Sequence, residues 1–188
     1  MSKNIILNEK EIGIILQRLA CQLIENHQDF SNTILIGLQP RGKSLLNRVV
    51  QILTHNYNVS DLNYGLLDIT FYRDDFRRNE KILEANSTDN LQVEGKNVIL
   101  MDDVLFTGRT IRAALTAVET FGRPNNIELL TLIDRRFSRH LPIQPDYRGR
   151  QIDVYNNQKV IVDWNNEIGK DCVYIINKLW MNWVLTIC

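Results

Sequence analysis

The sequence predicts an α/β fold with a doubly wound, mostly parallel sheet. Residues 33–38, 98–101 and 127–133 are short apolar runs of the kind found in strands that are buried on both faces. Helical patterns follow the first two runs, and this alternation is typical of parallel sheets. Two later runs, around residues 160–162 and 172–176, predict strands without a long helix between them.

The N-terminal part begins with a predicted amphipathic helix. Asn8 and Glu11 have the spacing of a capping box, and apolar residues then recur on one helical face up to about His27. After the strand at 33–38, residues 39–42 form a predicted turn. A second helix follows, marked by an apolar stripe at Leu45, Leu46, Val49, Val50 and Leu53.

The middle of the chain contains a strand-like run at residues 66–71 and then a polar stretch at residues 73–96. The next strand, at 98–101, leads into a helix that starts near Ile111 and ends near Gly122. The strand at 127–133 completes the alternating part of the chain.

Composition indicates one soluble domain over residues 1–188. The 188 residues are 44% hydrophobic and 23% charged, which is enough for one sizeable core. Basic and acidic residues balance at 22 each, so net charge gives no reason to expect attraction to nucleic acid or to a membrane. Three cysteines without metal-ligand spacing, and a start without a long apolar stretch, predict a cytoplasmic protein with no membrane partner.

The most informative segment is residues 98–110. Its apolar strand runs into the adjacent carboxylates Asp102 and Asp103, which can accept hydrogen bonds from two neighbouring hydroxyls of a ribose. The residues Thr107, Gly108, Arg109 and Thr110 then supply backbone N–H groups and two hydroxyls at the start of a helix, where a phosphate binds well. An acidic strand exit followed by a capped helix is the alternative interpretation.

The whole of this segment resembles the phosphoribosyl pyrophosphate (PRPP) binding motif of type I phosphoribosyltransferases. The resemblance implies that Asp102 and Asp103 hold the ribose hydroxyls and that residues 107–110 hold the 5′-phosphate. It leaves the identity of the base open.

Two further polar segments suit such a site. Arg41, in the turn after the first strand, could meet pyrophosphate while the turn offers backbone N–H groups. The polar stretch at 73–96 is a candidate lid, because water must be kept from the reacting sugar carbon. As alternatives, Arg41 is only solvated and the stretch is an ordinary surface loop.

Four segments together resemble the family of bifunctional pyrimidine-operon attenuation regulators and uracil phosphoribosyltransferases. They are residues 36–42, 67–75, 98–124, and 132–135 followed by 141–146. The resemblance implies a type I phosphoribosyltransferase fold with a small hood, contributed mainly by residues 136–160. It also implies Mg²⁺-dependent transfer from PRPP to uracil, giving UMP and diphosphate, in a homo-oligomer of two or more chains.

The resemblance assigns roles by position. Arg41 and Gly42 belong to the pyrophosphate turn, and Arg73 belongs to the loop that closes on pyrophosphate, which makes it catalytic together with Asp102 and Asp103. Asp134 and Arg135 lie beside the base. Mg²⁺ is held largely by ligand oxygens and water, so no metal site made by protein side chains alone is expected.

The family's second activity is binding messenger RNA in a nucleotide-dependent way. Residues 135–150 contain five arginines and a single acid, Asp146, and Arg18 on the first helix matches a basic position of the family. Arg18, Arg139 and Arg148 are therefore the candidate RNA-binding residues. An equally good alternative is that these arginines are solvated or form salt bridges.

The chain departs from the family pattern at three places. Pro40 replaces the usual Thr, residues 136–140 form a segment that is one residue longer, and Cys21 replaces a His. The C-terminal residues 178–188 match no pattern. Two other functions therefore stay open: a non-catalytic regulator that senses nucleotide and binds RNA, and a phosphoribosyltransferase for a purine base.

Overall fold

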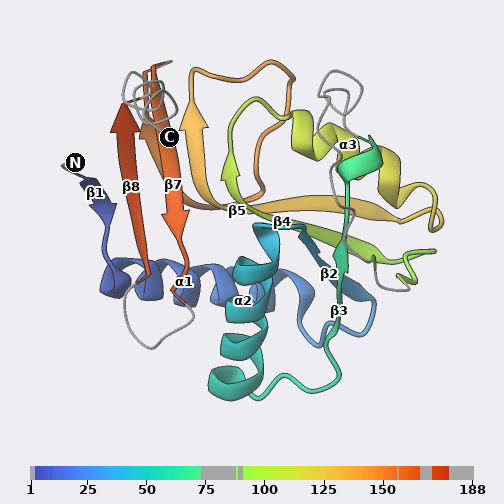
Figure 1. The fold of residues 1–188 in the computed structure, drawn as a ribbon. Helices are drawn as coiled ribbons and strands as arrows, with labels where there is room; N and C mark the ends of the chain where they lie inside the picture. The colour runs from blue at the N-terminus through green and yellow to red at the C-terminus, as the bar shows by residue number, and fades with distance from the viewer. Residues whose placement is uncertain (1–2, 73–87, 89–90, 156, 166–170, 178–188) are drawn as a thin grey trace.

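The computed structural model describes residues 3–72, 88, 91–155, 157–165 and 171–177 (Figure 1). Its helices and strands, in chain order, are β1 (Asn4–Leu7), α1 (Glu9–His27), β2 (Thr33–Leu38), α2 (Gly42–Tyr57), β3 (Asn63–Leu67), the 3₁₀ helix η1 (Thr70–Tyr72), β4 (Asn97–Leu105), α3 (Arg109–Val118), β5 (Asn126–Arg136), β6 (Tyr147–Asp153), β7 (Gln158–Asp163) and β8 (Cys172–Asn177).

The main sheet has five strands in the order β3-β2-β4-β5-β6, and every neighbouring pair is parallel. Its order places β4 at the centre. Helices α1 and α2 lie on one face and α3 lies on the other, so the sheet is doubly wound (Figure 1). The predicted α/β class and parallel sheet are confirmed.

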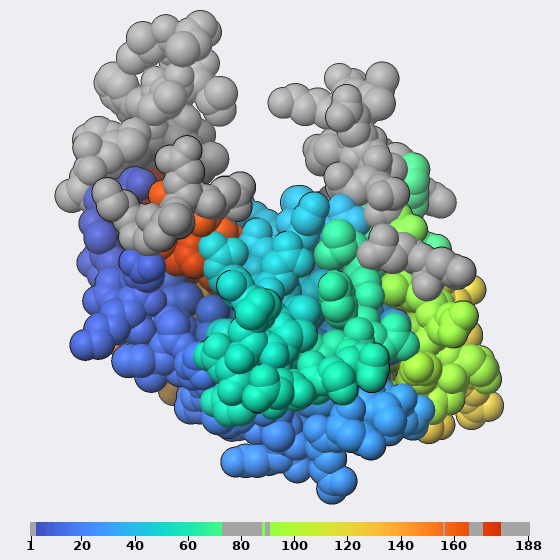
Figure 2. All heavy atoms as spheres, turned by 90° about the horizontal axis from the view of Figure 1, so that it is seen from below, coloured from blue at the N-terminus to red at the C-terminus, as the bar shows by residue number. Residues whose placement is uncertain are grey.

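The first helix begins as the sequence predicts. The Asn8 side chain accepts a hydrogen bond from Glu11 N, and the Glu11 side chain accepts one from Asn8 N, which completes the capping box. The buried face of α1 packs against the core on the same side as α2. The two helices cover this face of the molecule, with α1 in blue and α2 in cyan to teal (Figure 2).

A second, three-stranded antiparallel sheet has the order β1-β8-β7. Arg48 of α2 links it to the main body, because its Nε and Nη2 donate to the two carboxylate oxygens of Asp171 at 2.6 and 2.7 Å. The Arg48 guanidinium also lies 4.4 Å from the centre of the Trp164 ring. This anchor fixes the β7–β8 end of the small sheet against α2.

The structure differs from the sequence prediction in four strands. The strand expected at 66–71 lies earlier, at Asn63–Leu67, and residues 70–72 form a 3₁₀ turn. Strand β4 runs on to Leu105, because its ladder with β5 continues through Asp102 opposite Thr131 and Val104 opposite Ile133. Strands β1 and β6 were not predicted.

The hood was predicted mainly at residues 136–160. Within that range Tyr147–Asp153 form β6 of the main sheet, whereas the separate small sheet takes its strands from both ends of the described chain. No helix within the described ranges is long and apolar enough to cross a membrane.

Candidate phosphoribosyl site

The candidate site gathers at the carboxyl ends of three adjacent strands. The turn 39–42 follows β2, the carboxylates Asp102 and Asp103 lie in β4, and Asp134 and Arg135 lie near the end of β5. Ligands of open parallel sheets bind at this edge. The structure thus brings together most of the residues that the sequence singles out.

Both carboxylates of β4 are deeply buried. Asp102 is 8% exposed and Asp103 is 2% exposed. Asp102 Oδ1 accepts a hydrogen bond from Asp103 N at 3.0 Å. The Oδ2 atom of Asp103 is buried without a hydrogen-bond partner within the described residues, and it forms an ion pair with Arg41, whose Nη1 lies 3.5 Å away. This oxygen is therefore an acceptor that a ligand hydroxyl could satisfy.

Burial raises the pKa of the Asp103 carboxyl, because water no longer stabilises the charged form. The neighbouring Arg41 guanidinium works in the opposite direction and lowers this pKa. Arg41 is half exposed, so its pairing with Asp103 is partly screened by solvent. A ligand that donates hydrogen bonds to Asp103 would favour the ionised form further.

The turn after β2 lies directly on β4. A Cβ atom at Gly42 would come within 2.2 Å of Met101 O, so no other residue fits there without moving the backbone. The Gln39–Pro40 peptide bond is cis, and Gln39 N donates to Leu67 O at 2.9 Å. The close approach of Gly42 to β4 brings the preceding residue, Arg41, to Asp103, and Arg41 Nη1 lies 3.5 Å from Asp103 Oδ2.

The predicted phosphate turn joins β4 to α3. Gly108 has φ of 90°, a left-handed conformation that favours glycine. A Cβ atom at this position would lie 3.3 Å from Ile143 Cδ1, so the turn also packs closely against residues 141–143. Helix α3 begins at Arg109, whose N–H donates to Thr107 Oγ1 at 3.4 Å. The positive end of the helix favours an anion at this turn.

Two consecutive residues brace the phosphate turn from behind. The Arg139 guanidinium donates to Phe106 O and to Asp134 Oδ1, and His140 N donates to Thr107 O at 3.0 Å. In a trans peptide the C=O and N–H groups point in opposite directions. Holding the carbonyls of Phe106 and Thr107 therefore directs the N–H groups of Thr107 and Gly108 away from the brace.

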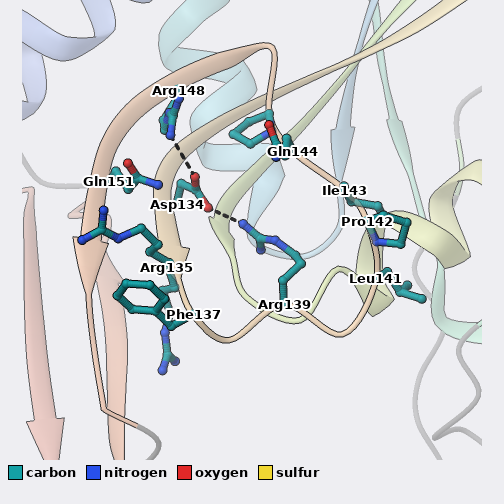
Figure 3. Close-up of a pocket in the computed structure, with 12 residues that line it drawn as sticks. Asp134, Arg135, Phe137, Arg139, Leu141, Pro142, Ile143, Gln144, Arg148 and Gln151 are labelled. Atoms are coloured by element: carbon teal, nitrogen blue, oxygen red, sulfur yellow. Dashed lines mark hydrogen bonds and ion pairs between the residues drawn. The ribbon is translucent and has the colours of Figure 1, made fainter.

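The residues expected at the base line a cavity of about 490 Å³ (Figure 3). Asp134 Oδ2 lies 3.4 Å from Arg148 Nη1, and Asp134 Oδ1 accepts from Arg139, so two arginines hold this carboxylate. Arg135 is 3% exposed and its guanidinium lies 4.0 Å from the centre of the Phe106 ring. The cavity combines planar cations with apolar side chains.

The expected RNA-binding arginines have different surroundings. Arg18 Nη2 donates to Arg148 O and Gly149 O at 2.8 and 2.7 Å, which joins α1 to β6. Arg148 is 44% exposed in its side chain. Arg139 points inward to the brace, a position that no local sequence pattern indicated. Arg73, expected to be catalytic, lies outside the described residues, as does most of the candidate lid.

Comparisons with known proteins agree with this geometry. A model of the phosphoribosyl transferase domain matches residues 2–165. A hypoxanthine phosphoribosyltransferase from Trypanosoma cruzi superposes with a TM-score of 0.71, at 17% identity, over 94% of this chain and 97% of that one. The chain has the phosphoribosyltransferase fold.

Closer relatives identify the family. The bifunctional protein PyrR of Synechocystis sp. is 41% identical over 91% of this chain and 95% of its own. The bifunctional protein PyrR of Clostridium novyi is 39% identical over 94% of this chain and 98% of its own. The chain belongs to the PyrR family of phosphoribosyltransferases, as the sequence resemblance predicts.

Replacing Asp103 tests the buried carboxylate. Asp103→Asn keeps the shape but removes the charge, so kcat/KM for PRPP should fall by about two orders of magnitude or more, roughly 3 kcal/mol of transition-state stabilisation. Steady-state kinetics would measure the loss, with circular dichroism to check the fold. Activity close to that of the unchanged chain would refute a role for Asp103 at the ribose.

Replacing Arg139 tests the brace. Arg139→Ala should raise KM for PRPP by about tenfold or more, because a charge-assisted hydrogen bond contributes roughly 1.5–3 kcal/mol, while KM for the base changes less. Arg139→Lys should recover part of the loss, since one amine can still reach an acceptor. Arg150→Ala, which removes an exposed arginine of β6, is the matched control. Equal KM values in Arg139→Ala and the control would contradict the brace.

Proposed function

We propose that the chain transfers the phosphoribosyl group of PRPP to uracil and releases UMP and diphosphate. The observation that carries this proposal is the pair of buried carboxylates in β4, located between the Arg41 turn and the start of α3. The resemblance of its four segments to uracil phosphoribosyltransferases supports uracil as the base.

The residues suggest a division of labour across the sheet edge. The turn 107–110 would bind the 5′-phosphate, and Asp102 and Asp103 would hold the ribose hydroxyls. As the bond from C1′ to diphosphate breaks, positive charge develops on the sugar and negative charge on the leaving group. The carboxylates would lie beside the sugar and stabilise its positive charge. Arg41 and Gly42 would lie beside the diphosphate, where the Arg41 guanidinium stabilises the negative charge.

Mg²⁺ is proposed as the cofactor, bound together with PRPP. Within the described residues there is no group of three or more His, Cys, Asp or Glu that could hold a metal ion. The carboxylates of β4 offer hard oxygen ligands, and Mg²⁺ commonly completes its shell with phosphate oxygens and water. When bound, the ion would neutralise charge on the diphosphate. No covalent nucleophile is needed from the protein.

The base would lie beside Asp134 and Arg135. These residues lie near the end of β5, and Asp134 pairs with Leu105, three residues beyond Asp102 on β4. Backbone donors and acceptors at a strand end could match the alternating groups of a pyrimidine ring. Asp134 is already held by Arg139 and Arg148, so its side chain is fixed before the base arrives.

A panel of bases tests the proposed reaction. The purified chain should release diphosphate from PRPP and Mg²⁺ with uracil, and not with hypoxanthine, guanine or without a base. A coupled diphosphate assay measures the release. Release with a purine would assign the chain to purine bases, whereas the absence of release with every base tested would favour a regulator that binds nucleotide without turnover.

A second candidate function is nucleotide-dependent RNA binding. Both PyrR relatives are named as bifunctional proteins, which is consistent with a second activity. Arg18 on α1 and Arg148 on β6 lie side by side at the surface, since the Arg18 guanidinium reaches the Arg148 carbonyl. Arg139 is mostly buried in the brace, so we place the proposed RNA contact on Arg18 and Arg148.

RNA binding should depend on Arg148 and on UMP. Leader transcripts of the pyrimidine biosynthesis genes should bind more tightly with UMP than without it, and Arg148→Gln should weaken binding and lower the salt slope by about one, as expected for one phosphate contact. Arg123→Gln, an exposed arginine at the opposite end of the sheet, serves as the control. Equal affinities for both variants would exclude this face.

A further inference from the structure

One aromatic side chain borders the cavity beside Asp134. Phe137 directly follows β5, and it is the only aromatic residue among the described residues that line this cavity. The residue is 79% exposed. Single exposed apolar residues are common at protein surfaces, so exposure alone assigns no role to this ring. The backbone of Phe137 and the contact made by its ring set it apart from other exposed residues.

The backbone of Phe137 has a conformation that residues with a side chain rarely adopt. Its φ is 64°, in the left-handed region that favours glycine. Both flanking residues are held by the fold, because Arg136 pairs with Asp153 in the β5–β6 ladder and Arg139 donates to Phe106 O. The chain thus keeps a large ring at a position where glycine would be less strained. Strained residues of this kind concentrate at ligand sites.

The ring of Phe137 is supported by a neighbouring cation. The Arg136 guanidinium lies 4.6 Å from the centre of the ring, a cation–π contact. That guanidinium is itself oriented by Asp153, which accepts hydrogen bonds from Nε and Nη2 at 2.8 and 2.6 Å. Since the guanidinium covers one face of the ring and the residue is 79% exposed, the other face is open.

We propose that Phe137 is a base-stacking residue, whose open face packs against the planar ring of the nucleobase when that ring lies beside Asp134 and Arg135. The inference rests on the proposed function, which places the base in this cavity. Every nucleobase has a π-face on which an aromatic side chain can stack with an offset. Stacking of this kind strengthens binding of the base and leaves the choice of base to the groups at its edge.

The surroundings of the ring favour a planar ligand over a protein partner. Its chain neighbours Arg136, Ser138 and Arg139 are charged or polar, and the apolar run at 141–143 lies on the other side of the cavity (Figure 3). A stable interface between proteins needs a broad, closely packed area, whereas one ring beside a cavity suits one flat group.

The stacking contact would be a feature of this chain rather than of its family as a whole. Phe137 belongs to the segment 136–140, which is one residue longer than the family pattern. The additional length lets the chain reverse direction after β5 before Arg139 and His140 reach the phosphate turn. The same segment therefore presents the ring to the cavity and braces the turn.

Equilibrium binding tests the contact without turnover. Isothermal titration of the full chain would compare UMP with ribose 5-phosphate, which lacks the base. Phe137→Ala should lower the preference for UMP over ribose 5-phosphate by about fivefold or more, as expected for the loss of one stacked ring. The affinity for ribose 5-phosphate itself should stay the same. Alanine also has a Cβ atom, so the positive φ remains unfavourable and the main change is loss of the ring.

Two other variants serve as controls. Phe137→Tyr keeps the ring and should keep the preference for UMP. Tyr64→Ala removes an aromatic residue that is 52% exposed on β3, at the opposite edge of the main sheet, and should also leave the preference unchanged. Should Phe137→Ala not fold, Phe137→Leu keeps an apolar side chain without a ring and should lose the preference in its place.

Three outcomes overturn the proposal. They are an unchanged preference for UMP in Phe137→Ala, an equal loss of affinity for UMP and ribose 5-phosphate, and an equal loss of preference in Tyr64→Ala. Light scattering would be measured on each variant, because a change in oligomeric state with an unchanged preference would assign the ring to a contact between subunits instead.

Inosine monophosphate, titrated alongside UMP, separates the stacking contact from the choice of uracil. If the unchanged chain prefers inosine monophosphate but not UMP over ribose 5-phosphate, uracil is the wrong base. The stacking contact is then supported only if Phe137→Ala lowers the preference for inosine monophosphate. A chain that prefers neither nucleotide over ribose 5-phosphate gains nothing from the base, and this result would overturn the stacking contact as well.

Discussion

The burial of two adjacent carboxylates in the central strand is the constraint on which the site depends. Asp102 and Asp103 continue a strand whose preceding residues form the core, so their backbone is fixed by pairing with β5. Charged groups at such a position are costly unless partners are supplied. Here the partners are a backbone N–H, a half-exposed arginine and, in the proposed reaction, the hydroxyls of a sugar.

Contacts with β4 and with the turn that follows it fix the positions of the neighbouring segments. The turn after β2 approaches β4 so closely that Gly42 tolerates no side chain, and this contact brings Arg41 to Asp103. On the other side, the segment after β5 reaches back to the carbonyls of Phe106 and Thr107 through Arg139 and His140. The groups proposed to bind pyrophosphate, ribose, phosphate and base are thus linked by direct contacts between their segments.

Much of this architecture follows from local sequence patterns. The apolar run at 33–38 predicts β2 with its observed bounds, and the spacing of Asn8 and Glu11 predicts the capped start of α1. The two carboxylates, Gly42 and residues 107–110 can be identified from the sequence because they follow the predicted strands at 33–38 and 98–101. These features depend on residues close in sequence, which is why a sequence can show them.

The features that the sequence does not show depend on distant partners. Strand β6 has four exposed residues in seven and no strong strand pattern, and it forms because β5 supplies its hydrogen bonds. Strand β1 is four residues long and pairs with β8, from the opposite end of the described chain. The brace by Arg139 and the packing of Arg135 on Phe106 arise from contacts across the fold, so local spacing contains no sign of them.

The most direct test of the central claim is a crystal structure of the chain with ribose 5-phosphate. The phosphate should accept hydrogen bonds from the backbone N–H groups of residues 107–110, and the ribose hydroxyls should donate to Asp102 and Asp103. A phosphate bound elsewhere, or a sugar whose hydroxyls do not contact these carboxylates, would contradict the assignment of β4 as the ribose-binding strand.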